Sequence, residues 1–295
     1  MHLRATVAAV SGAVALSALA LPAAHAADGG SSYRAHVAEA LAQHAPGRSA
    51  RTAAAAPVGD LNVSFSGFRI SKAIKVGTGA RVSPVVTYKL THGADVDITD
   101  PAFLTGPMIY RGRAEDPVNI QGGEAPATCV ETSATTATCK GRIDIDPRET
   151  GVDVKLRNSQ AGTWHGAALA WDVDSDRMSL QFGLGSTLVR RNAVLTANAA
   201  PEPVKKGRTL TVTGRLTRAD WQDHKYHGYS GQPVKLQFRK KGSSAYTTLK
   251  TVRTNSAGSL KTTAKATADG YYRFSFAGTT TTAAVSAAGD FVDVK

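Results

Sequence analysis

Three runs in the last third of the chain alternate apolar or small side chains with polar ones, and this is the clearest pattern in the sequence. The runs cover residues 234–238, 260–266 and 272–276. Side chains point to opposite faces along a strand, so a period of two predicts strands with one buried face. Asn255 to Gly258 and Asp269–Gly270 separate the runs and supply turn chemistry.

Further strands are predicted at residues 210–216 and 291–294 and near Val204. Residues 246–253 alternate less cleanly, which indicates a bulge or an exposed edge strand. The count is about seven strands in the last 95 residues, the size of an immunoglobulin-like sandwich. No cysteine follows Cys139, so this core must form by packing alone.

The same segment resembles bacterial Ig-like or prealbumin-like modules of secreted actinobacterial proteins. The resemblance covers about a third of the chain. It lies in the residues that begin and end strands and turns, namely 203–207 with 210–214, 231–234, and 270–273 with 276–278. It implies a β-sandwich that serves as a spacer or a binding unit. A fold of this kind does not by itself fix a function.

The middle of the chain, residues 58–199, also has short alternating runs and no long helical period. Strands are expected at residues 61–65, 85–90, 167–171 and 186–195, with turns at 77–79, 122–123 and 183–185. The fold class predicted is therefore all-β, with two β-sandwich domains in tandem at residues 58–199 and 200–295. Residues 198–206, which contain Pro201 and Pro203, are expected to link them.

The first residues read as a targeting segment. Arg4 precedes an apolar run at residues 5–21, and Ala24 and Ala26 fit a small-x-small cleavage site, so residues 1–26 are predicted to be a secretory signal peptide. A membrane anchor is the alternative, but the run is shorter than the roughly 20 residues of a span. Residues 27–57 are expected to form a flexible Ala-rich arm with few core groups, in which a short helix at 33–43 is one option.

The only two cysteines, Cys129 and Cys139, flank a threonine-rich loop. In an exported protein such a pair should form a disulfide, which stabilises by roughly 2–3 kcal/mol under the chain-entropy model. A redox or metal pair is disfavoured, because there is no C-x-x-C spacing and no nearby histidine.

Charge separates the two halves of the chain. From Pro201 onward there are 16 Lys and Arg against 6 Asp and Glu, whereas residues 58–200 hold 15 of each. By the alternation, four of these cations face outward on the last sandwich: Lys235, Arg239, Lys241 and Arg273. They indicate either ordinary surface solvation or adhesion to an anionic cell-wall polymer or an acidic polysaccharide. Nucleic acid is disfavoured, because no RNP-like aromatic motif accompanies them.

The stretch 221–231, WQDHKYHGYSG, interrupts the strands with an aromatic-rich loop, and its candidate binding residues are Trp221, Tyr226, His227 and Tyr229. The three aromatic rings could stack on sugars. Asp220, Asp223, His224 and His227 are a candidate metal set, although the spacing is not specific. The alternative is that the aromatics cover one end of the sandwich core.

Asp172, Asp174 and Asp176 resemble the opening of a calcium loop, but Arg177 stands where an EF-hand needs glycine and Gly183 where it needs glutamate. Calcium therefore enters only as a candidate without EF-hand geometry, and no other cofactor is expected. Motifs for a serine hydrolase elbow, a zinc protease or a phosphate loop are missing.

These patterns predict a secreted, non-enzymatic binding or adhesion protein whose basic C-terminal module contacts an anionic envelope polymer or glycan. One alternative is an inhibitor or interaction module for another exported protein, with the Cys129–Cys139 hairpin as the presenting element. A calcium-binding secreted protein and a hydrolase built on the middle region are further alternatives.

Overall fold

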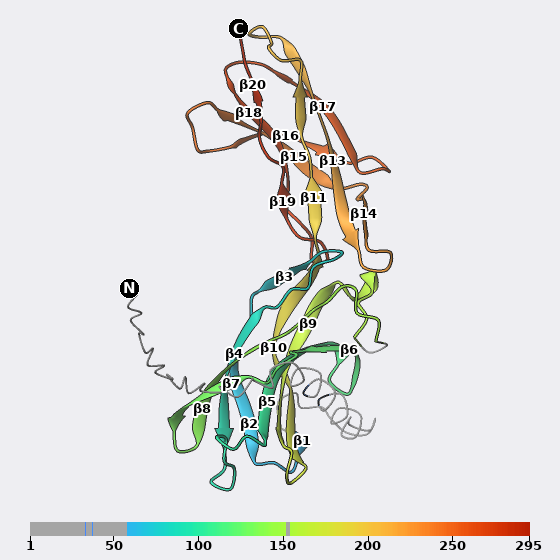
Figure 1. Cartoon of the computed structure of the whole chain (residues 1–295). Coiled ribbons are helices and arrows are strands. Elements are labelled where there is room, and N and C mark those ends of the chain that lie inside the picture. The colour runs from blue at the N-terminus through green and yellow to red at the C-terminus, as the bar shows by residue number, and fades with distance from the viewer. Residues whose placement is uncertain (1–32, 34–36, 38–57, 152–153) are drawn as a thin grey trace, which may run out of the picture.

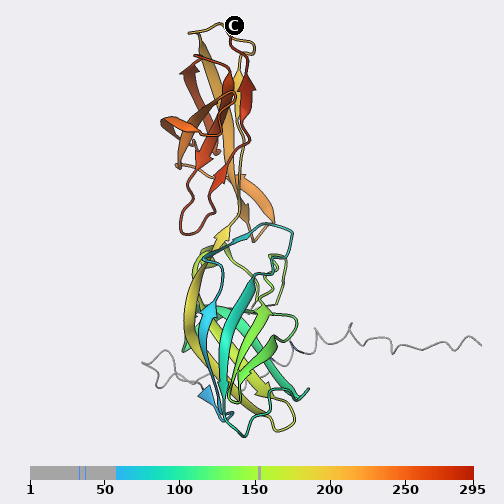
Figure 2. The same cartoon turned by 90° about the vertical axis from the view of Figure 1, so that its left-hand side faces the viewer.

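The computed structural model describes Tyr33, Val37, residues 58–151 and residues 154–295. These residues form two β-sandwiches stacked end to end, with the C-terminus at the far end of the second (Figures 1 and 2). The predicted signal peptide and almost all of the predicted arm lie outside the described residues. The all-β fold with two sandwiches in tandem agrees with the sequence pattern.

Two sheets face each other in the N-terminal sandwich. One has the order β2-β4-β8-β7 and the other the order β1-β10-β9-β5-β6, with β3 parallel to β10. The bounds are β1 Val58–Gly59, β2 Val63–Arg69, β3 Ala73–Val76, β4 Val85–His92, β5 Phe103–Arg113, β6 Asp116–Gly122, β7 Thr128–Ser133, β8 Thr136–Arg142, β9 Gly162–Asp172 and β10 Arg177–Arg191. Between the sheets lies a core that includes Tyr88, Leu90, Ile109 and Trp164, all 2% exposed or less.

The strands expected at residues 85–90 and 167–171 lie within β4 and β9. The turn expected at residues 183–185 is wrong, because these residues lie inside β10. Its pairing with β9 shifts between Phe182 and Ser186, and Gly183 and Gly185 have φ of 74° and 142°. Glycine accepts these angles without a Cβ clash, so the strand bulges here and does not end.

The C-terminal sandwich is Ig-like, and its central strand is β13. β13 pairs with β11, β12, β14 and β17, while the second sheet has the order β16-β15-β18-β19 with β20 beside β18. The bounds are β11 Ala193–Leu195, β12 Asn198–Ala200, β13 Thr209–Asp220, β14 Lys225–Gly228, β15 Pro233–Lys240, β16 Thr247–Arg253, β17 Ser259–Lys265, β18 Gly270–Phe276, β19 Val285–Ser286 and β20 Asp290–Val292.

The alternation in this sandwich places side chains as predicted. Leu236, Tyr272, Phe274 and Phe276 are 3% exposed or less. The less regular run, β16, is an edge strand paired only with β15, and its register shifts opposite Leu236 and Gln237. Packing between two sheets therefore forms this core without a disulfide.

The linker expected at residues 198–206 is wrong, since Asn198–Ala200 forms β12 and pairs with β13. The chain passes from one sandwich to the other at Asn192, the single residue between β10 and β11. Pro201 and Pro203 follow β12 and join strands of the same sandwich.

Two described residues lie in the expected flexible arm, and both contradict it locally. Tyr33 and Val37 are helical, 5% and 8% exposed, and belong to an apolar cluster with β5, β9 and β10. In the parts of the chain that the structure describes, no helix is long and apolar enough to cross a membrane.

Candidate binding face and the junction between the sandwiches

The four cations singled out from the sequence share the outer face of the sheet β16-β15-β18. Across β15 and β18, Lys235 pairs with Ser275, Gln237 with Arg273 and Arg239 with Tyr271. Paired residues point to the same side of a sheet, so this register brings Lys235, Arg239 and Arg273 together. Lys241 follows two positions after Arg239. We call these four cations with the rings described next the cationic face.

Three aromatic rings interleave with the cations. The Arg273 guanidinium carbon lies 3.6 Å from the centre of the Tyr246 ring, and that of Arg239 lies 4.1 Å from the centre of the Tyr271 ring. Arg239 is also 5.3 Å from the Tyr246 centre, and the Lys241 ammonium is 5.5 Å from the Phe291 centre. The negative faces of the rings attract these cations and hold them in place.

Hydrogen bonds fix the two arginines further. Arg239 Nη1 donates to the Ser243 carbonyl at 2.6 Å, and Arg273 Nε donates to Gln237 Oε1 at 2.9 Å. The pKa of Arg239 is raised, chiefly by its hydrogen bond with the Tyr246 side chain. A guanidinium has five N–H donors, so each arginine retains donors for a planar anionic group.

No acidic residue occupies the outward positions of β15, β16 and β18 on this face. The carboxylate at its end is that of Asp269, 3.7 Å from Lys241 Nζ. The outward position of Arg253 on β16, opposite Pro233, adds a cation that the alternation argument did not use. The face therefore carries a concentrated positive field.

The aromatic-rich stretch at residues 221–231 connects the two sandwiches, which the sequence did not indicate. β13 continues past its own sandwich into a hairpin with β14, and the tip of this hairpin enters the N-terminal sandwich. Trp221, at the tip, is 0% exposed and belongs to the core of that other sandwich. Its indole Nε1 donates to the Val76 carbonyl at 3.2 Å. Trp221 is thus closed to any sugar, and the core that it covers is that of the neighbouring sandwich.

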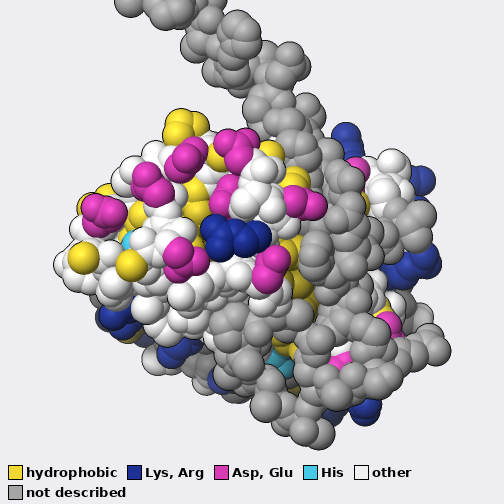
Figure 3. Space-filling view, turned by 90° about the horizontal axis from the view of Figure 1, so that it is seen from below, with side chains coloured by type: hydrophobic (Ala, Val, Ile, Leu, Met, Phe, Trp, Pro, Cys, Tyr) yellow, Lys and Arg dark blue, Asp and Glu magenta, His cyan; other side chains and the backbone are white. Residues whose placement is uncertain are grey.

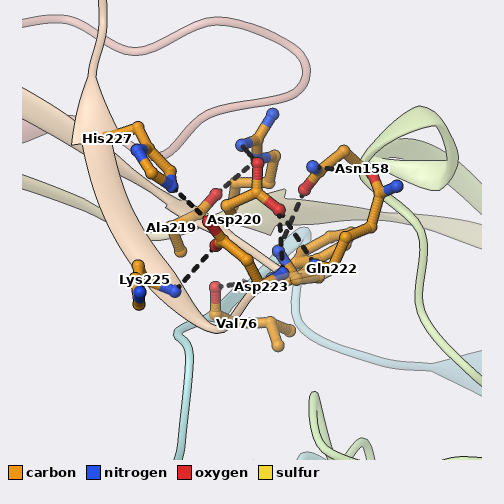
Figure 4. A network of polar contacts seen from close by, with 10 residues as sticks. Val76, Asn158, Ala219, Asp220, Gln222, Asp223, Lys225 and His227 are labelled. Atoms are coloured by element: carbon orange, nitrogen blue, oxygen red, sulfur yellow. Dashed lines mark hydrogen bonds and ion pairs between the residues drawn. The ribbon is translucent and has the colours of Figure 1, made fainter.

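Figure 4 shows the network of polar contacts at the junction, to which Trp221 also belongs through its hydrogen bonds. The Trp221 backbone N–H donates to Asn158 Oδ1 at 3.0 Å, and Asn158 Nδ2 donates to Gln222 Oε1 at 2.8 Å. Asn158 lies in a single 3₁₀ turn, Asn158–Gln160, which faces the hairpin.

Arg191 and Asn192 complete the junction from the end of β10. Arg191, 7% exposed, donates from Nε to the Ala219 carbonyl at 2.5 Å, and its Nη2 is 3.5 Å from Asp220 Oδ2. Burial lowers the pKa of Arg191, and Arg218 adds to this. Asn192 Nδ2 donates to the Tyr226 hydroxyl at 3.0 Å. Tyr226 therefore belongs to the junction and is only partly exposed.

Of the candidate metal set, Asp220, Asp223 and His227 do come together, with donor atoms within 4.8 Å of one another. Each is already engaged: His227 Nε2 is 2.6 Å from Asp223 Oδ2, and Asp220 pairs with Arg191. The fixed positive charge of Arg191 opposes a second cation here. The trio therefore serves the hairpin as a hydrogen-bonded cluster.

The remaining sequence candidates are dispersed. Tyr229 packs edge-on to Phe276 at 5.9 Å with Arg218 over its ring at 4.0 Å, on the C-terminal sandwich. His227 is exposed beside Asp223. The residues that sequence reasoning missed are Tyr246, Tyr271 and Phe291. Tyr271 had a signal, since it is in phase with Arg273 on the outward side of its strand.

The calcium candidates lie at the opposite end of the molecule, in the turn between β9 and β10. Asp172 accepts from the Ser175 hydroxyl at 2.5 Å and lies 3.6 Å from Arg177, while Asp176 accepts from the Trp171 indole at 3.3 Å. Arg177 also reaches Asp95 at 3.3 Å. Figure 3 shows acidic side chains gathered around basic atoms at this end. These carboxylates turn toward an arginine and their own loop, and the Asp174 backbone also hydrogen-bonds to the Asp172 carboxylate.

Cys129 and Cys139 form the predicted disulfide. They are directly paired residues of β7 and β8. β7 is the outer strand of its sheet, and Val130 on it is 66% exposed.

Sequence comparisons and structure comparisons give different results for this chain. No protein-family model matches it, and no curated protein matches. Solved structures that are similar include a marsupial T cell receptor, at 13% identity and TM-score 0.33, covering 79% of this chain and 73% of that one.

Two further solved structures are also similar. The fibronectin(III)-like modules of Clostridium thermocellum CbhA match at 13% identity and TM-score 0.25, with 77% and 92% of the two chains covered. The D0-D1 domain of intimin matches at 16% and 0.25, with 78% and 98% covered. At such values the fold assignment rests on the strand topology above, and nothing about ligand or activity follows.

Proposed function

We propose that this protein is a secreted, non-enzymatic binding protein that adheres through its cationic face to an anionic polymer of a cell envelope or to an acidic glycan. In this proposal residues 1–26 direct export, the two domains meet at Asn192, and the second is a module of the actinobacterial Ig-like kind. The observation that supports it most is the convergence of Lys235, Arg239, Lys241 and Arg273 with three aromatic rings on one outer sheet face.

The chemistry of this face favours a repeating anion over a single small ligand. Arginines stacked on rings lose little side-chain freedom when they bind, because they are already held. Phosphate or carboxylate groups accept two parallel N–H bonds from a guanidinium. Sugar rings can lie against the partly exposed rings of Tyr246 and Tyr271. An envelope polymer or acidic polysaccharide offers both the anionic groups and the sugar rings in series.

Retention on purified cell walls and on immobilised acidic polysaccharide across a salt series tests the proposal. Wild-type protein should be retained at low salt and released as salt rises, because screening weakens exposed charge pairs. The double variant Arg239→Gln/Arg273→Gln should bind about tenfold more weakly, the loss of roughly 1.4 kcal/mol.

The control is Lys261→Gln/Lys265→Gln, which removes the same charge from exposed positions of β17 in the other sheet. It should keep nearly wild-type retention. Equal loss in both double variants would mean that net charge alone drives binding and would reject a defined face. Absence of retention by wild type at low salt would reject the proposal altogether.

A second candidate is an interaction or inhibitor module for another exported protein. It is favoured by the exposed outer strand β7, where the disulfide to β8 fixes the register and Val130 is 66% exposed. An extended segment of a partner could pair with such an edge. Inhibition of secreted hydrolases by wild type and not by Val130→Lys would support it.

A further inference from the structure

The sheet that contains β5, β9 and β10 is apolar on both faces. Its inner face, with Ile109, Ala168 and Ala170, packs on the other sheet of the N-terminal sandwich. Its outer face carries a second cluster of residues that are 7% exposed or less: Met108, Tyr110, Ala167, Leu169, Met178, Leu180 and Phe182. The outer face of a sandwich ordinarily alternates to polar side chains, and an apolar face of this size requires a cover.

Tyr33 and Val37 lie on this outer face. Both are helical, and a separation of four residues puts them on one side of a helix. Burial raises the pKa of the Tyr33 hydroxyl far above its ordinary value. The ring sits against Gly106 of β5, where an added β-carbon would overlap the Tyr33 hydroxyl. Glycine at this strand position thus leaves the space that the ring fills.

The chain returns to the same sheet after the 20 residues that follow Val37. β1 begins at Val58 and pairs with Leu180 and Ser179 of β10, beside the outer cluster. Residues 38–57, 20 in number, join Val37 to β1 in the sequence. A covalent connection of that length makes docking intramolecular and gives the segment a high effective concentration at the face.

We infer that the outer face of β5-β9-β10 is a docking surface for an amphipathic helix with an aromatic and an aliphatic residue four positions apart, and that its occupant is this chain's own segment carrying Tyr33 and Val37. The segment is an exchangeable cover and not a spacer. This inference concerns the N-terminal sandwich and is independent of polymer binding by the cationic face.

A double-mutant cycle in the full mature chain tests whether the cover is seated. Gly106→Ala should lower the urea midpoint of the N-terminal sandwich, because the new methyl displaces Tyr33. The atoms nearest to the added carbon are all from Tyr33, so Gly106→Ala should cost little in a Tyr33→Ala background. Strictly additive shifts in the double variant would overturn the docking.

Exchange in trans is tested with a labelled peptide of residues 31–44. The full-chain variant Tyr33→Ala/Val37→Asp has a disabled cover and should bind the peptide, at least tenfold more tightly than wild type, whose face is occupied. A peptide with the same two substitutions should bind neither protein. Binding of the native peptide to neither protein, or equally to both, would overturn exchange, as would self-association of the variant without peptide uptake.

Discussion

Single side chains on the cationic face act in pairs of cation and ring. Tyr246 is the common partner, because Arg273 and Arg239 both lie over it, at 3.6 Å and 5.3 Å. Such contacts contribute roughly 0.5–1 kcal/mol each at exposed sites. The ring therefore orders two charges without adding any. A change at Tyr246 alters the position of these charges and leaves the net charge of the protein unchanged.

Tyr246→Ala should weaken retention on the anionic polymer by a few-fold, although the net charge stays at +12. The reason is that both guanidiniums regain the freedom that the ring removes. Retention against salt is the measurement, with Tyr246→Phe as the control that keeps the ring. If Tyr246→Ala releases at the same salt concentration as wild type, the rings have no part in binding.

Among the elements, the β13–β14 hairpin has two roles at once. Near Leu210 and Val212, β13 is the central strand of its own sandwich, and at Ala219 it contacts the other one. Asp220 holds the tip: its Oδ1 accepts the Gln222 N–H at 2.9 Å, and its Oδ2 faces Arg191. Burial raises the pKa of Asp220, but the Asn158 side-chain hydrogen bond, the backbone hydrogen bonds and the charge of Arg191 together leave it lowered.

Acid should loosen the junction. A carboxyl whose folded pKa is lowered stabilises fully above its unfolded pKa of about 3.9, and this contribution is lost as pH falls through the folded value. The distance between labels on the two sandwiches, followed from pH 6 to pH 2, is the measurement. In Asp220→Asn the junction should already be looser at pH 6, and the distance between the labels should change less as the pH falls. Parallel curves for the two proteins would contradict this role.

At the scale of the whole molecule, the two sandwiches are coupled by packing and differ in charge. The junction buries Trp221 and Arg191, so it resembles a core more than a linker. One end of the molecule gathers aspartates around Arg177, whereas the cationic face lies on the other sandwich. The coupling holds that face at a fixed orientation to the rest of the protein.

Trp221→Ala should destabilise the N-terminal sandwich by about 3–5 kcal/mol, the typical effect of removing a buried tryptophan. It should also widen the range of angles between the two sandwiches. Small-angle X-ray scattering would show this as a wider distance distribution. Trp221→Phe fills most of the space but lacks the indole N–H. It should lose less stability and widen the distance distribution less than Trp221→Ala. An unchanged denaturation midpoint in Trp221→Ala would show that the tip is not inserted.

The sequence predicted the position of some residues and not of others. The alternation through Leu236 and Phe274 predicted the strands and core of the C-terminal sandwich, because burial of a strand face depends on local period. Gly183 led to the wrong prediction of a turn at residues 183–185, since glycine suits a bulge within a strand as well as a turn. The role of Trp221 was out of reach, because its partners Val76 and Asn158 are distant in sequence.

By itself the sequence determined the β class, the disulfide partners and the outward side of the four cations, because these follow from period, cysteine number and charge along one strand. Only the tertiary structure decided that Tyr246 and Phe291 join those cations, that Trp221 inserts into the other sandwich and that Tyr33 covers a sheet. Each of these contacts joins residues from separate elements, and a linear pattern holds no information on which elements meet.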